Sequence, residues 1–220
     1  MSPLKNLTVP PSLKEMAFQS LKAAILSNKL EPGEIYNEQT LAKELGISKT
    51  PVREALLDLV TKGFITLLPR RGVQVNVLTE KDIKDLYDVR IALETAIVRL
   101  IIPKLTEEAL KKIETIHKKE QTAIKTDDRL GYLQIDREFH LYLANLTENR
   151  YMATSLENIR DLIDWMGFKA LMRKARMKEV KEEHKRIIEK LRKRDSKGVE
   201  HLMEEHIRIT EKNVLQRFRD

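Results

Sequence analysis

Four polar residues interrupt helical stripes that are otherwise apolar. In the stretch "YLQIDREFHLYL", Asp136 and His140 are one helical turn apart and share a side with leucines. His184 lies on a similar aliphatic stripe further along the chain, and so does His206. A lone histidine on an apolar face is usually a hydrogen-bonded core residue. An aspartate and three histidines directed into one bundle are harder to satisfy that way, whereas a divalent cation would bind all of them.

The donor atoms limit which metals are expected. The chain has no cysteine, which excludes disulfides, thiolate chemistry and zinc fingers of the cysteine type. One carboxylate and three imidazoles suit zinc, nickel, manganese or iron, so we expect one divalent transition metal per chain. The other two histidines, His117 and His201, have charged neighbours in the sequence and are interpreted as surface residues.

A second set of candidate residues lies at the start of a predicted helix near residue 48. Ser48 is in the position of a helix cap, and the apolar side of the helix leaves Lys49, Thr50 and Arg53 facing outward. An arginine in such a position can bind guanine through two hydrogen bonds, and a lysine can reach the same acceptors or a phosphate. The alternative is that each is an ordinary solvated cation on the surface.

A predicted hairpin adds cations to the same region. Arg70 and Arg71 precede Gly72 at its tip, where a glycine allows the backbone to approach a phosphate or the minor groove closely. The helix start and the hairpin tip together favour a DNA-binding surface over isolated surface cations.

The elements that position these residues are mostly helical. Aromatic residues make up 5% of the chain, and there are seven glycines and seven prolines, which favours helices over sandwiches or barrels. Before residue 78, short helical patterns are followed by two alternating apolar stretches around "PRRG". The second and third helical patterns are joined by a turn at Gly46, which indicates a helix-turn-helix with a hairpin wing.

After residue 78 the helical period continues almost to the C-terminus. Helices are predicted from Thr79 towards Pro103, from Thr106 onward, and over 127–146, 149–171, 174–194 and 197–217. The charge run "KARMKEVKEEHKRIIEKLRKRD" has acids and bases at helical spacings, so we interpret it as a solvated helix face rather than a nucleic-acid patch.

These patterns predict a mainly α protein with two domains. Residues 1–78 form a winged helix-turn-helix with a small β-hairpin wing, and residues 79–220 form an all-α bundle of six or seven helices. The sequence has neither an apolar run of membrane-spanning length nor a secretory signal, so a cytoplasmic protein is expected. The net charge of +7 permits binding to a polyanion but does not indicate it alone.

The N-terminal third resembles a known family. The motifs "LAKELGIS", "TPVREAL" and "RRGVQV" are similar in order and spacing to the winged helix-turn-helix of the GntR superfamily of bacterial transcription regulators. The resemblance implies DNA contacts from Lys49, Thr50, Arg53 and Gly72, with Ser48 as helix cap and phosphate contact. Many members have arginine where this chain has Gln39 and Lys49, so the resemblance does not specify the operator sequence.

Residues 79 to about 217 resemble the FCD effector domain of the FadR subgroup of that superfamily, a helical bundle. In this family an Asp-x-x-x-His pair and two later histidines bind a divalent metal, which implies the ligands Asp136, His140, His184 and His206. The motif "LYDVRIALE" matches the start of such domains and puts Arg90 on the inward stripe of its helix. A buried arginine needs an anionic partner. That partner is either an internal carboxylate, such as Glu94, or a carboxylate effector.

The sequence therefore predicts a DNA-binding transcription regulator rather than an enzyme. A small carboxylate metabolite at the metal is expected to control its affinity for DNA, and a homodimer is expected to bind a palindromic operator. One alternative is a metal-dependent hydrolase with an appended DNA-binding module. Another is an architectural DNA binder with a structural metal. The inward stripes offer no obvious general base for the hydrolase.

Overall fold

The computed structural model describes residues 10–170 and 174–219. Most of the segment inspected for a secretory signal, residues 1–9, lies outside this range, as does residue 171, the last of one predicted helix. The chain divides between Val77 and Leu78 into two compact units, and each is considered by itself.

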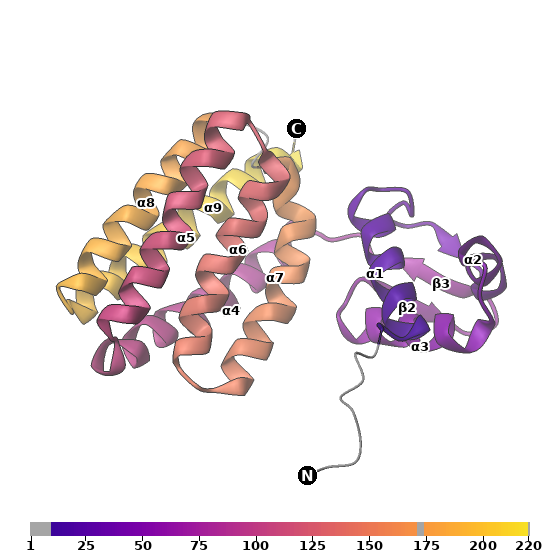
Figure 1. Cartoon of the computed structure of the whole chain (residues 1–220). Coiled ribbons are helices and arrows are strands. Elements are labelled where there is room, and N and C mark those ends of the chain that lie inside the picture. Colours follow the sequence, from indigo (N-terminus) through magenta and orange to yellow (C-terminus); the bar gives the residue numbers. More distant parts are fainter. Residues whose placement is uncertain (1–9, 171–173, 220) are drawn as a thin grey trace, which may run out of the picture. The chain divides into compact units, whose positions relative to one another are not determined.

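The N-terminal unit combines helices with a small sheet (Figure 1). Its elements are α1 (Leu13–Leu26), β1 (Ile35–Tyr36), α2 (Glu38–Leu45), α3 (Lys49–Thr61), β2 (Ile65–Leu68) and β3 (Gly72–Val75). The Ser12 side chain accepts a hydrogen bond from the Glu15 N–H, and the Glu15 carboxylate accepts one from the Ser12 N–H, so a capping box starts α1. Gly46 ends α2 at a φ of 68°, a left-handed conformation that favours glycine.

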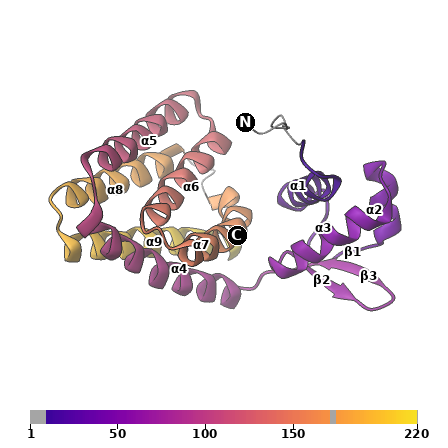
Figure 2. The same ribbon diagram turned by 60° about the horizontal axis from the view of Figure 1, so that its bottom comes forward.

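The sheet contains one more strand than the predicted hairpin. β2 and β3 pair as antiparallel strands with Ile65 opposite Val75, and β1 pairs with the other edge of β3. Figure 2 shows the three strands beside the helices of this unit. β1 is two residues long, which is too short to leave an alternating pattern in the sequence.

A common core holds α1 against α3. The α1 side chains that contribute to it are Ala17, Leu21 and Ile25. The apolar side of α3, which was predicted from helical spacing, is also buried; it consists of Val52, Ala55, Leu56 and Leu59. Burial of this side leaves the first turn of α3 and its opposite side in contact with solvent.

The C-terminal unit is an all-α bundle (Figure 1). Its elements are α4 (Glu80–Ile101), the 3-10 helix η1 (Ile102–Lys104), α5 (Glu107–Thr126), α6 (Arg129–Leu146), α7 (Arg150–Ala170), α8 (Lys174–Arg192) and α9 (Ser196–Arg219). Helix α4 packs along α9, while α5 packs against both α6 and α8. These six α-helices within the described part of the chain confirm the predicted bundle.

The main apolar core of the bundle has residues from every α-helix of the unit, and a second, smaller apolar cluster is formed by residues of α5, α6 and α8. Polar residues enter it on α4, α5, α6, α7, α8 and α9, and the charged or imidazole groups among them are Arg90, Glu94, Glu120, Asp136, His140, Arg160, Asp161, Arg176, His184 and His206. Over residues 10–170 and 174–219, no helix combines the length and the apolar character needed to cross a membrane.

Candidate functional site

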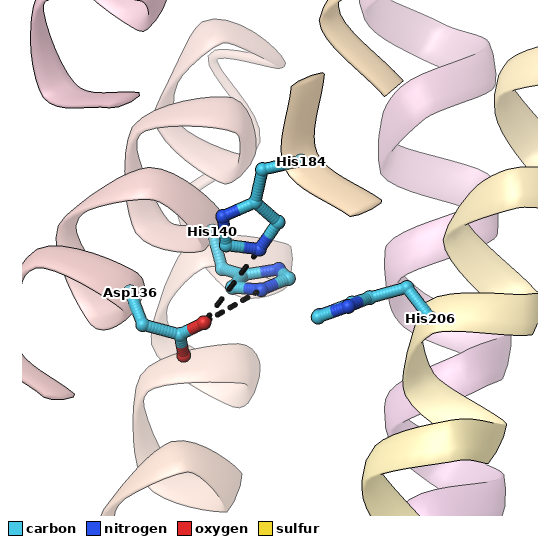
Figure 3. A group of neighbouring side chains, drawn as sticks. All are labelled: Asp136, His140, His184 and His206. Atoms are coloured by element: carbon cyan, nitrogen blue, oxygen red, sulfur yellow. Dashed lines mark ion pairs between the residues drawn. The ribbon is translucent and has the colours of Figure 1, made fainter. Parts of the chain in front are cut away.

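The predicted ligand residues lie together inside the bundle. Asp136 and His140 are on α6, His184 is on α8, and His206 is on α9. All four are buried, and one potential ligand atom from each lies within 4.8 Å of the others. Figure 3 shows the four side chains turned towards a common space between three helices.

The atoms that face this space make few hydrogen bonds with each other. Asp136 Oδ1 is 3.8 Å from His140 Nε2 and 3.6 Å from His184 Nε2, both beyond hydrogen-bond length (Figure 3). The Nε2 atoms of His184 and His206 are buried without a hydrogen-bond partner among the described residues. Leaving buried polar atoms unpaired is costly, so this arrangement suits an additional cation between them.

A carboxylate holds the Nδ1 atom of each imidazole. The pairs are His140 with Glu94, His184 with Glu120 Oε1 at 2.6 Å, and His206 with Glu183 Oε2 at 2.6 Å. An Nδ1–H group that donates to a carboxylate fixes the ring orientation and makes Nε2 the atom available to a metal. The Nε2 atoms of His184 and His206 have no partner among the described residues, whereas that of His140 contacts Arg90. The three glutamates come from α4, α5 and α8, so different helices orient the three rings.

Burial and nearby charges set the ionisation of these groups. Burial raises the pKa of Asp136, but the Arg160 guanidinium and the imidazoles outweigh it, so that pKa lies well below its ordinary value. Burial lowers the pKa of His206 to about 4 and that of His140 well below its usual range. Burial also lowers the pKa of His184, but its Glu120 partner more than compensates and raises it overall. A cation bound at Nε2 would compete with a proton for His184.

Arg90 is buried and has an internal carboxylate partner. Its side chain is 1% exposed, and its Nε donates to Glu94 Oε1 at 2.6 Å. The internal carboxylate predicted as one alternative is therefore present. A second guanidinium nitrogen, NH2, lies 3.2 Å from His140 Nε2, at the edge of the ligand cluster.

A small cavity of about 30 Å³ adjoins the cluster. Its lining includes Tyr87, Asp136 and three arginines, which are Arg90, Arg160 and Arg176. Arg160 is 1% exposed and binds Asp136, while Arg176 is 3% exposed and binds Glu183. Ion pairs therefore connect the cavity wall both to a ligand residue and to the carboxylate that orients another.

Several of these residues were not predicted from the sequence. The solvated-face interpretation of the charge run in α8 is wrong for two of them, because Arg176 and Glu183 point into the bundle. Glu120 follows Ile116 by one turn on an apolar stripe, which was a signal that could have identified it.

His117 was predicted to lie at the surface, but it is half-buried and its Nε2 lies 3.0 Å from the Lys181 carbonyl oxygen. His201 is exposed, as expected.

The predicted contact residues at the start of α3 face solvent. Lys49, Thr50 and Arg53 are exposed, and the Lys49 ammonium donates to the Gln39 side chain at 3.1 Å, which links α3 to α2. Ser48 occupies the N-cap position, but its side chain makes no cap hydrogen bond with any described residue. The predicted cap position is therefore confirmed, although the Ser48 hydroxyl is exposed and does not bind the helix backbone.

The hairpin tip requires glycine for a structural reason. Arg70 and Arg71 are exposed at the turn, and Gly72 follows with a φ of 119°. A Cβ atom at Gly72 would lie 2.3 Å from the Tyr36 carbonyl oxygen, so a larger residue would disturb the contact between β3 and β1. Pairing with the third strand accounts for this glycine without a close approach to DNA.

Comparison with known proteins identifies both units. Residues 13–75 match the model of the bacterial regulatory proteins of the gntR family, and residues 85–209 match the model of the FCD domain. The uncharacterized HTH-type transcriptional regulator YdhC of Bacillus subtilis (strain 168) is 32% identical over 183 residues, which cover 82% of this chain and 81% of that protein. The gluconate operon transcriptional repressor of the same strain is 31% identical over 187 residues, with coverage of 85% and 75%.

The fold is also similar to that of solved structures. E. coli McbR/YncC superposes with a TM-score of 0.79 at 23% identity, covering 95% of this chain and 100% of the other. A putative transcriptional regulator GntR from Rhodococcus sp. RHA1 superposes with a TM-score of 0.77 at 21% identity, covering 94% and 99%. The matched families and sequence relatives are transcription regulators rather than enzymes, which confirms that expectation. The chain therefore belongs to the GntR family of DNA-binding transcription regulators and combines the winged helix-turn-helix of that family with an FCD domain.

Proposed function

We propose that a small carboxylate, held at a divalent metal inside the bundle, controls the affinity of this regulator for its operator. The observation that carries the proposal is the set of imidazole Nε2 atoms and one carboxylate within 4.8 Å, with two of the Nε2 atoms lacking a partner among the described residues. A core network made only of hydrogen bonds would leave these buried atoms unpaired.

The proposed metal ligands are Asp136, His140, His184 and His206, with zinc, nickel, manganese or iron as the ion. The paired glutamates support this assignment, because metal-binding histidines usually donate their other ring N–H to a carboxylate or carbonyl. Four protein ligands can close a tetrahedral zinc site, whereas an octahedral ion would supply a positive charge and keep two coordination positions for water or an exogenous acid.

Arg90 is the proposed effector contact. It is buried beside His140 and lines the cavity next to the ligand cluster. A guanidinium in this position can bind a carboxylate more strongly than a neutral metabolite, because charge-assisted hydrogen bonds are stronger than neutral ones. Since Glu94 already binds Arg90, the acid would share this arginine with an internal partner.

The proposed DNA surface consists of the start of α3 and the hairpin tip, with the residues Ser48, Lys49, Thr50, Arg53, Arg70, Arg71 and Gly72. The exposed side chains on α3 are suited to base edges and phosphates in the major groove, and those of the tip to phosphates or the minor groove. We further propose that the protein binds a palindromic operator as a homodimer, so that two recognition helices read two half-sites.

Control of DNA binding requires a connection between the units. The segment "VNVLTEKD", residues 75–82, runs from β3 into the capped start of α4, the helix that carries Arg90. The acid must bind one arrangement of the dimer better than another, because a ligand with equal affinity for both shifts nothing. We expect effector binding to release DNA.

Calorimetric titration tests the acid site. Metal-loaded protein is titrated with short monocarboxylates, hydroxy acids and dicarboxylates, and metal-stripped protein serves as the reference. We expect binding only to the loaded protein and weaker binding to Arg90→Ala. Acid binding that is equal with and without metal would contradict the metal site, and unchanged binding to Arg90→Ala would remove Arg90 from it.

A further inference from the structure

Two buried donor groups in the cavity wall lack acceptors among the described residues. The Tyr87 hydroxyl has no hydrogen-bond partner there, although its side chain is fully buried. Arg160 uses NH2 to bind Asp136, but its Nε and NH1 have no hydrogen-bond partner, and the residue is 1% exposed. Buried donors are rarely left unpaired, because each loses its hydrogen bonds to water without replacement.

Both donors border the same cavity as Arg90 and Asp136. The Tyr87 hydroxyl is a neutral donor at physiological pH, since burial raises its pKa to about 12. Arg160 carries a permanent positive charge. Because neither group is a predicted metal ligand, the pair is suited to a part of the effector that does not touch the metal.

The donors of Tyr87 and Arg160 indicate which chemical group of the effector they would bind. A hydroxyl donor beside a guanidinium matches an acceptor with more than one oxygen and a negative charge, which is a carboxylate. The lining of the cavity includes three arginines and two aspartates, and Arg90 and Arg176 are already paired with Glu94 and Glu183, so among the described residues the unpaired guanidinium donors at the cavity are those of Arg160. The cavity volume of about 30 Å³ corresponds to roughly two water molecules at ~10–15 Å³ each, which favours a short molecule and requires side chains to move on its entry.

We infer that Tyr87 and Arg160 form a specificity subsite for a second carboxylate, so that the effector is a short dicarboxylate. This inference rests on the proposed function, because the first carboxylate is the one held at the metal and Arg90. The subsite explains why a buried tyrosine and a buried arginine keep donors without acceptors among the described residues.

Propionate and succinate provide the test, since succinate is propionate with a second carboxyl group. Both are titrated calorimetrically into metal-loaded full-length protein: wild type, Tyr87→Phe, Arg160→Lys and the control Tyr142→Phe. Tyr142 is a half-buried tyrosine on α6 that is absent from the cavity lining. Metal content and melting temperature are measured for each protein, because Arg160 also binds the ligand residue Asp136.

We expect wild type to bind succinate at least about tenfold more tightly than propionate. Tyr87→Phe should weaken succinate binding about tenfold and change propionate binding less than about twofold, with metal content unchanged. Arg160→Lys keeps the charge but lacks the free guanidinium donors, so it should show the same selective loss, whereas Tyr142→Phe should match wild type.

Several results would overturn the inference. Equal affinity of wild type for the two acids would show that no second-carboxylate subsite exists. A Tyr87→Phe protein that keeps wild-type affinity for succinate, or loses affinity for both acids equally, would exclude Tyr87 from such a subsite. If neither acid binds loaded wild-type protein, the proposed metal-held carboxylate fails, and this inference fails with it.

Discussion

Replacing His184 by glutamine should remove most of the stabilisation that a metal gives the bundle. His184 is 0% exposed, and its Nδ1 is 2.6 Å from Glu120 Oε1. Alanine would leave the buried Glu120 carboxylate without this partner, which is strongly destabilising by itself. The amide of glutamine can still donate to Glu120 but replaces the imidazole ligand, so His184→Gln separates loss of metal from loss of a buried ion pair.

The size of the effect follows from binding linkage. Free metal at a hundredfold excess over its Kd stabilises the wild type by about 2.7 kcal/mol, which corresponds to a Tm increase of about 10 °C for a domain of this size. If the variant binds metal a hundredfold more weakly, the same concentration supplies only about 0.4 kcal/mol, or about 1–2 °C. The comparison uses the difference in Tm between metal-loaded and chelator-treated samples of each protein.

Differential scanning calorimetry measures this difference, with the exposed His201→Gln as the matched control. The control should keep the full metal-induced shift. A His184→Gln protein with the wild-type shift would show that His184 is not a ligand. A wild type that shows no shift with zinc, nickel, manganese or iron would refute the site as a whole.

Three further predictions concern other parts of the molecule. Glu120→Gln should weaken metal binding about 10- to 100-fold in a chelator competition, because the carboxylate that orients His184 is lost. An unchanged metal affinity would show that Glu120 does not orient a ligand. Arg53→Ala should reduce discrimination between operator and random DNA by about 1–3 kcal/mol. Arg71→Ala should weaken binding to all sequences and lower the slope of log affinity against log salt concentration by about one. Selection from a random DNA pool must first recover an enriched motif, or the sequence-specific interpretation fails. Gly72→Ala should destabilise the N-terminal unit by about 1–3 kcal/mol in denaturant unfolding, because of its positive φ and the contact with Tyr36, and a stable variant would contradict that account.

Helical spacing predicted the candidate ligands because each lies on a stripe with aliphatic neighbours. Asp136 and His140 are one turn apart on one helix, so their shared side follows from the helical period alone. Their convergence with His184 and His206 required the assumption of one bundle core, and the structure brings all four together.

The pairing of these residues with their partners could not be predicted in the same way, although the apolar stripe of α5 marks Glu120 as an inward residue. Glu120 lies 64 residues from His184 in the chain, and no periodic pattern connects positions on different helices. Arg176 occurs among many charged residues of α8, so the sequence did not distinguish the charged side chains that face the bundle from those that face solvent. At Gly72 the expectation that glycine is needed agrees with its positive φ, and the structure adds a reason that the sequence did not show, the contact with β1, a strand too short to predict.

Operator binding by the metal-loaded protein tests the central claim most directly. Fluorescence anisotropy with a labelled operator, recovered by selection, gives the affinity of metal-loaded and metal-stripped protein with and without saturating succinate. We predict that succinate weakens operator binding by the metal-loaded protein about 5- to 150-fold, equivalent to a coupling of about 1–3 kcal/mol, and has no effect on metal-stripped protein. An operator affinity that stays the same when the acid is bound at the metal would contradict the account.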